Sequence, residues 1–176
     1  MIKEKTMRYT SAEANKLLKG IEARIDDLKN KEKKSRSFHA ASTEDPEVLR
    51  PAYDFEETQK QIAALEKDVR IVKHAINMFN VTHTVPDFDE LTIDQALVYL
   101  PQLSNRVSKL KLMAAALPRE RAMSYGSNII DYEIANYDIA GAEQMYRSEQ
   151  ERLRKLQTAL DRANSGETME IDIVLT

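Results

Sequence analysis

Apolar residues recur at alternating steps of three and four along four stretches of this 176-residue chain, and this spacing constrains the fold most. Such steps keep the apolar side chains on one side of a helix, where a left-handed coiled coil buries them. The spacing predicts four helices of roughly 24–27 residues each. The seam residues are Ala14, Leu18, Ile21, Ile25 and Leu28; Phe55, Thr58, Ile62, Leu65, Val69, Val72, Ile76 and Phe79; Ile93, Ala96, Leu100, Leu103, Val107, Leu110, Ala114 and Leu117; and Ala142, Tyr146, Glu149, Leu153, Leu156, Leu160 and Ala163.

Residues that begin or interrupt helices agree with this periodicity. Thr10 with Glu13, and Thr92 with Gln95, form the pattern of a capping box, in which each side chain satisfies a backbone N–H of the other residue. Pro101 lies inside the third stretch and lacks an N–H, so we expect a kink or a later helix start there.

The chain contains an internal repeat. A shift of 82 residues superposes the first seam on the third, and a shift of 84 superposes the second on the fourth. Positions outside the seams match as well: Tyr53-Asp54 with Tyr137-Asp138, Asn80 with Asn164, and Thr84 with Thr168. Asp54 and Asp138 are also suitable N-caps. The sequence predicts one domain over residues 1–176, duplicated as about 8–86 and 90–173.

Short extended segments are expected at the ends of the helices. Residues 81–85 and 168–173 alternate apolar and polar side chains, as strands do, and residues 2–9 lie at the same end and can join them. Residues 130–134 alternate likewise within the long connection 119–137. The predicted fold is mainly α: two tandem antiparallel helical hairpins, in a coiled-coil or four-helix arrangement, with minor β segments at the ends.

Composition excludes several classes of protein. The chain has 26 Lys and Arg against 29 Asp and Glu, a net charge of −3, which argues against a general nucleic-acid binder. It has no Cys, so thiol nucleophiles, disulfides and zinc fingers are excluded. Since no stretch approaches 18 apolar residues and the N-terminus has no apolar core of a signal peptide, we expect a cytoplasmic protein without membrane contact.

Several motifs resemble those of small bacterial helical proteins of the septicolysin-like group. They are Glu44-Asp45-Pro46, the segment 75–80 followed by 91–97, and the segment 156–161 followed by 169–172. The resemblance implies a helical, self-associating bacterial protein. These motifs mark turns and caps rather than chemistry. The name of the group suggests pore formation, but the sequence has no long apolar segment and no membrane-length alternating strand to support it.

No pattern of catalytic or metal-binding residues is found. The three histidines, His39, His74 and His83, fall on different predicted elements and lack metal-ligand spacing. Asp87, Asp89 and Glu90 form an acidic cluster before the third helix, which a charged turn explains without a metal. We therefore expect no enzyme activity, no metal and no cofactor.

Glu149 interrupts the fourth seam, where the repeat has Leu65 in the second. A polar seam residue can fix the register or the oligomeric state of helices at some cost in stability. Alternatively, the helix is exposed at this position.

Basic residues gather at the ends of the first and third helices, each cluster with a net charge of +4. Attraction to helix C-terminal carbonyls explains much of this placement. The alternative is an anion site beside the segment 125–128, because basic side chains and backbone N–H groups together hold phosphates. Its candidate ligand-binding residues are Lys33, Lys34, Arg36, Arg119, Arg121, Ser127 and Asn128.

Two functions follow from these observations. The first is a non-enzymatic, self-associating helical assembly or interaction protein of bacterial or phage type, whose partner is a further copy of itself. It rests on the seams, since long hairpins leave helix sides bare unless other helices cover them. The alternative is a protein that binds or sequesters a small anionic ligand, such as a nucleotide, at a basic loop end or a subunit interface.

Overall fold

The computed structural model describes residues 7–122 and 130–173, except for the side chain of Asp89. It is 67% helical, as the heptad spacing predicts. The helices are α1 (Ser11–Ser35), α2 (Pro46–Leu49), α3 (Phe55–Thr82), α4 (Ile93–Ala114) and α5 (Ile139–Gly166). The strands are β1 (Met7–Thr10), β2 (Thr84–Val85), β3 (Phe88–Thr92), β4 (Arg119–Arg121), β5 (Tyr132–Ile134) and β6 (Thr168–Ile171).

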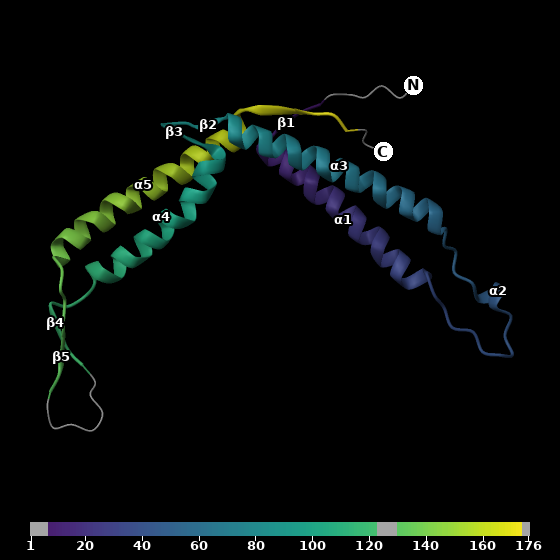
Figure 1. Ribbon diagram of the computed structural model, residues 1–176, viewed down its shortest axis with the longest axis horizontal. Helices are drawn as coiled ribbons and strands as arrows, with labels where there is room; N and C mark the ends of the chain where they lie inside the picture. Colours follow the sequence, from purple (N-terminus) through teal and green to yellow (C-terminus); the bar gives the residue numbers. More distant parts are fainter. Residues whose placement is uncertain (1–6, 123–129, 174–176) are drawn as a thin grey trace. The chain divides into compact units, whose positions relative to one another are not determined.

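The chain divides into two compact units. The first comprises Met1–Asn80 and Asn164–Thr176, and the second comprises Val81–Ala163. Each contains a hairpin of two long helices, α1 with α3 in the first unit and α4 with α5 in the second, as Figure 1 shows. The hairpin prediction is confirmed, whereas the predicted repeat boundaries and single domain stay predictions.

The first unit buries one apolar row on each of its two long helices. Ile21 and Ile25 of α1 and Ile62 and Leu65 of α3 are buried, at the spacing of three and four that the sequence shows. Because each helix is amphipathic, burying this row removes its apolar stripe from water, which drives the hairpin together. Strand β1 pairs antiparallel with β6, with Thr10 opposite Thr168, so residues 7–9 join the segment 168–173 as expected. The expected joining to residues 81–85 is wrong for Thr84 and Val85, which pair with β3 instead.

The second unit repeats this plan with its own strand pair. Leu103 and Val107 of α4 and Leu156 and Leu160 of α5 are buried. Strands β2 and β3 pair antiparallel, with Thr84 opposite Thr92. The pairs Thr10–Thr168 and Thr84–Thr92 occupy equivalent positions under the shifts of 82 and 84 residues.

Two tyrosines fix the starts of the returning helices. The Tyr53 hydroxyl donates to Glu32 Oε1 of α1 at 2.7 Å, and the Tyr137 hydroxyl donates to the Met113 carbonyl of α4 at 2.9 Å. Each tyrosine precedes an N-cap aspartate, whose carboxylate accepts from a backbone N–H in the first turn. The Tyr-Asp pair of the sequence repeat therefore plays the same structural role in both hairpins.

Both predicted capping boxes form. Thr10 and Glu13 exchange hydrogen bonds at the start of α1, and Thr92 and Gln95 do so at the start of α4. Hydrogen bonds from the Thr10 backbone N–H and hydroxyl hold the pKa of the Glu13 carboxyl below its ordinary value. This carboxylate stabilises the fold at neutral pH, and its contribution is lost as the pH falls through its lowered pKa.

Thr92→Ala is expected to lower the free energy of unfolding by about 1 kcal/mol, because the Gln95 N–H loses its acceptor. Urea denaturation followed by circular dichroism measures the change. Thr158→Ala is the control, since this exposed hydroxyl bonds only the Arg154 carbonyl within α5. An equal loss in the control would contradict the capping role of Thr92.

Several boundaries differ from the sequence predictions. Helix α3 continues through Val81 and Thr82, which had been assigned to a strand, and α4 begins at Ile93, so the later start suggested by Pro101 is wrong. The acidic cluster lies partly in β3 rather than wholly in a turn. A Pro86-Asp87 turn connects β2 to β3, and Asp87 has a φ of 64°, which Asp tolerates better than most residues.

The predicted seams are confirmed along most of their length and fail at two ends. Phe55 and Leu117 are exposed rather than buried. Phe55 is the first residue of α3, and Leu117 lies beyond the last residue of α4, so neither has a facing helix turn to pack against. The expected strand at 130–134 is found as β5, while its partner β4 and the short α2 were not predicted.

Candidate functional site

The predicted basic residues fall into two sets, one in each unit. Lys33 and Lys34 lie in the last turn of α1, and Arg36 is its C-cap; all three are exposed. Glu32, the carboxylate among them, accepts hydrogen bonds from Tyr53 and from Gln59 Nε2, each at 2.7 Å. The end of α1 is therefore cationic, and the carboxylate of Glu32 within it is already hydrogen-bonded by Tyr53 and Gln59.

Arg119 and Arg121 form the other set, on β4 of the second unit. They are two residues apart on the strand, so their side chains project to the same face. The guanidinium of Arg119 lies 3.4 Å from the centre of the Tyr132 ring, and Arg121 is paired directly with Tyr132. The predicted residues Ser127 and Asn128 lie outside the described residues.

The ribbon of β4 and β5 separates its charges between its two faces. Residues opposite each other in an antiparallel pair project to the same face. One face carries Arg119 and Arg121 with Tyr132 and Ile134, and the other carries Glu120 opposite Glu133. All six strand residues are exposed. A two-stranded ribbon with no buried face is marginally stable alone, so contact with another molecule would stabilise it.

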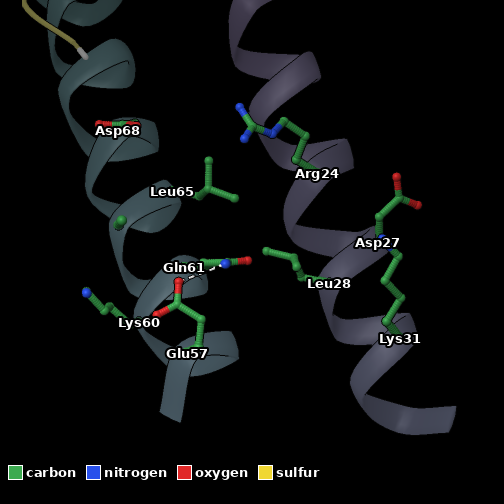
Figure 2. A pocket seen from close by; sticks show the side chains of 10 residues that line it. Arg24, Asp27, Leu28, Lys31, Glu57, Lys60, Gln61, Leu65 and Asp68 are labelled. Atoms are coloured by element: carbon green, nitrogen blue, oxygen red, sulfur yellow. Dashed lines mark hydrogen bonds between the residues drawn. The ribbon is translucent and has the colours of Figure 1, made fainter. Parts of the chain in front are cut away.

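A groove of about 540 Å³ lies between α1 and α3 of the first unit. Figure 2 shows Leu28 and Leu65 pointing into the space between the two helices, with charged side chains along both rims. Arg24, Asp27 and Lys31 line it from α1, and Glu57, Lys60, Gln61, Ala64 and Asp68 line it from α3 with Leu65. Gln61 Nε2 donates to Glu57 Oε1 at 2.9 Å within the α3 rim. The three cations and three carboxylates of the rims balance.

Ion pairs connect α1 and α3 away from this groove. Lys73 Nζ lies 2.9 Å from Glu22 Oε1, and Lys29 Nζ lies 3.4 Å from Glu66 Oε1. These pairs are exposed, so each contributes little stability, but their carboxylates already have cationic partners. Within the described parts of the chain, Asp27 and Asp68 of the groove rims take part in no ion pair. The side of the ion pairs is hollowed too, with a space of about 380 Å³ lined by Glu22, Ile25, Asp26, Lys29, Glu66 and Val69.

A further hollow, of about 380 Å³, was missed by the sequence analysis. It lies beside the β2–β3 turn and is lined by Asp87, Phe88, Arg154, Lys155, Thr158, Ala159 and Arg162. Its cations have carboxylate neighbours: Arg162 lies 3.3 Å from Asp87, and Arg154 and Lys155 both face Glu151. The sequence shows that Arg154, Lys155 and Arg162 lie close together along α5. It does not show that the β2–β3 turn folds against them.

Glu149 is only partly withdrawn from water, with 19% of its side chain exposed. One carboxylate oxygen lies 3.7 Å from Arg106 of α4, and the other is buried without a hydrogen-bond partner. Glu149 thus lies in the seam facing α4 and still reaches solvent, so the helix is only partly exposed at this position, and a role of Glu149 in register stays a prediction. An unpaired buried oxygen costs stability, so the seam tolerates Glu149 rather than requiring it for packing.

Two wider searches of the described residues bear on function. Within residues 7–122 and 130–173, no three His, Asp or Glu side chains gather as a metal site requires. Over the same ranges, none of the helices combines the length and apolar character needed to cross a membrane.

No protein-family model and no curated protein matches this sequence. A crystal structure of a functionally unknown conserved protein from Corynebacterium diphtheriae is similar in fold, with a TM-score of 0.57. The fold therefore has a known counterpart. The likeness covers 93% of this chain and 99% of that chain at 18% sequence identity. At this identity the likeness concerns the fold alone, and the resemblance to septicolysin-like proteins stays a prediction.

Proposed function

We propose that this protein is a non-enzymatic helical assembly protein that associates with further copies of itself. The observation that supports it is the apolar surface left on the long helices. Large apolar side chains remain exposed outside the buried rows, among them Met78 of α3, Leu97, Val98 and Leu112 of α4, and Met145 of α5. A hairpin of two helices covers one side of each helix, and association with another copy would cover more.

Absence of enzyme activity and a cytoplasmic location belong to the same proposal. They rest on the sequence, which lacks Cys and carries no arrangement of His, Ser and carboxylates typical of catalysis. An assembly protein needs only complementary surfaces and no reactive group.

The second candidate function is binding of a small anionic ligand. It is favoured by the shared face of Arg119 and Arg121 on β4, since two guanidinium groups on one face can both contact a phosphate. Tyr132 lies on the same face and offers a ring for stacking. The acidic residues Glu120 and Glu133 would confine an anion to this face.

Native mass spectrometry of the purified protein distinguishes the two candidates. Self-association predicts masses at multiples of 20.2 kDa without added mass. A retained anion that disappears in the Arg119→Ala/Arg121→Ala variant would favour the second candidate. A mass of one bare chain at every concentration would contradict both.

A further inference from the structure

We propose that the β4–β5 ribbon joins copies of this chain, with the basic face of one ribbon stacked on the acidic face of the ribbon of a second copy. This inference rests on the proposed self-association and names the two surfaces that meet. The basic face is formed by Arg119, Arg121, Tyr132 and Ile134, and the acidic face is formed by Glu120, Asp131 and Glu133.

The pairing of β4 with β5 decides which side chains share a face. The Ala122 N–H donates to the Asp131 carbonyl at 3.0 Å, and the Ala135 N–H donates to the Pro118 carbonyl at 3.1 Å, so the ladder continues one pair beyond each end of the strands. Side chains alternate between the two faces of a strand, so Asp131 projects with Glu133 to the acidic face. The ribbon therefore presents two guanidinium groups on one face and three carboxylates on the other.

Both faces are accessible, since all six strand residues are exposed and the ribbon lies beyond the ends of α4 and α5 (Figure 1). None of the charged side chains of the two faces forms an ion pair with another described residue. Glu120 lies directly opposite Glu133, and like charges in this position destabilise an antiparallel pair. Cationic groups placed against the acidic face would relieve this repulsion.

The guanidinium groups of the basic face are suited to this role. Arg119 lies over the ring of Tyr132, 3.4 Å from its centre. Such stacking engages the plane of a guanidinium group, whereas its N–H groups at the edge remain able to bind carboxylates. Arg121 lies directly opposite Tyr132 and projects to the same face. The two arginines are thus placed to donate to carboxylates of a second copy.

The sizes of the uncharged side chains are complementary as well. The basic face carries Tyr132 and Ile134, which are 44% and 67% exposed. By the alternation along the ladder, the acidic face carries the smaller residues Pro118, Ala122 and Ala135. When two sheets pack face to face, side chains of their inner faces interdigitate. Large side chains from one ribbon would therefore lie over small ones of the next and be removed from water.

Like charges exclude the two symmetric ways of stacking the ribbons. Two basic faces would bring arginines against arginines, and two acidic faces would bring carboxylates against carboxylates, which opposes association. Opposite charges meet only when the basic face of one copy contacts the acidic face of another. This contact is head-to-tail, so each copy uses one face for each neighbour, and association continues past two copies unless a ring closes.

Two single-cysteine variants test which faces meet, because the chain has no Cys of its own. Ile134→Cys places a thiol on the basic face, and Ala135→Cys places one on the acidic face without removing a charge. Each variant alone and an equimolar mixture are oxidised, and the disulfide-linked dimers are measured by mass spectrometry. The mixture should form several-fold more linked dimer than either variant alone. Equal linking in the single variants would show that like faces meet and would overturn the proposal.

Two charge-reversal variants test the same contact by sedimentation velocity. One is Arg119→Glu/Arg121→Glu, and the other is Glu120→Lys/Glu133→Lys. Each variant alone places like charges against each other, so its mass should fall towards that of a single 20.2 kDa chain. In an equimolar mixture each altered face meets an oppositely charged one, and the wild-type mass should return.

The controls separate this inference from the proposed function. Lys33→Glu/Lys34→Glu reverses two exposed cations at the end of α1 and should keep the wild-type mass. If the wild type associates and both ribbon variants keep its mass, or if their mixture fails to restore it, the stacking of the ribbons is wrong and self-association stands. A small anion retained by the wild type and lost in Arg119→Ala/Arg121→Ala would give the basic face a different occupant. If the wild type is a single chain at every concentration, the proposed function itself fails.

Discussion

Replacing Leu103 by Glu is expected to unfold the α4–α5 hairpin. Leu103 of α4 and Leu156 of α5 are both 0% exposed. A carboxylate at either position could therefore reach water only if the two helices separated. Loss of the apolar contacts and burial of an unpaired charge each cost several kcal/mol. Since whole domains are stable by only about 5–15 kcal/mol, the combined loss removes most of the stability. Far-ultraviolet circular dichroism should show a marked fall in helix content.

Asn105→Glu is the matched control, because Asn105 is exposed on the same helix two residues from Leu103. It should change the free energy of unfolding by less than about 0.5 kcal/mol. Leu156→Glu should act as Leu103→Glu does. If the double variant Leu103→Glu/Leu156→Glu kept the wild-type size and melting temperature, the assignment of these residues to the seam would be wrong.

Glu149→Leu is expected to stabilise the second unit, which is unusual for a substitution inside a helical interface. The equivalent residue of the first hairpin is Leu65, which is only 6% exposed. Leucine would remove the carboxylate oxygen that lacks a partner and restore an apolar contact with α4. Exchange of a partly buried ion pair for apolar packing is worth about 1–2 kcal/mol here. Urea denaturation should show a higher midpoint with an unchanged slope.

Glu149→Gln isolates the charge, because the amide keeps the size of the side chain but cannot pair with the guanidinium of Arg106. The reverse substitution in the first hairpin, Leu65→Glu, should destabilise it, because a carboxylate would replace an apolar side chain that is only 6% exposed. A Glu149→Leu protein that is less stable than the wild type would show that the contact with Arg106 outweighs the cost of the unpaired oxygen. A change in self-association with unchanged stability would favour the role of Glu149 in register.

The helical part of the fold could be predicted from the sequence because its determinants are local. The buried rows of α3 and α4 follow from their steps of three and four, and Thr10 and Thr92 begin their helices through bonds to residues three positions away. The end of α3 was missed because residues 81–82 also fit an alternating pattern. At a helix–strand boundary, such a short pattern does not decide between the two structures.

The candidate surfaces were harder to predict, because they depend on contacts between distant segments. The alternation of 130–134 indicates β5, but only its pairing with β4 shows that Arg121 and Tyr132 share a face. The sequence does not show that Asp27 and Asp68 line one groove, because they lie on different helices. The packing of α1 against α3 brings these two residues to the same groove, away from the ion pairs of Lys29 and Lys73.

Sedimentation equilibrium of the wild-type protein over a wide range of concentration tests the central claim of self-association most directly. The account predicts an average mass above 20.2 kDa that rises with concentration towards a multiple of this value. Association of exposed helical faces is a mass-action equilibrium, so dilution should shift it towards smaller species. A mass of 20.2 kDa throughout the range, with circular dichroism showing a folded helical protein, would contradict the account.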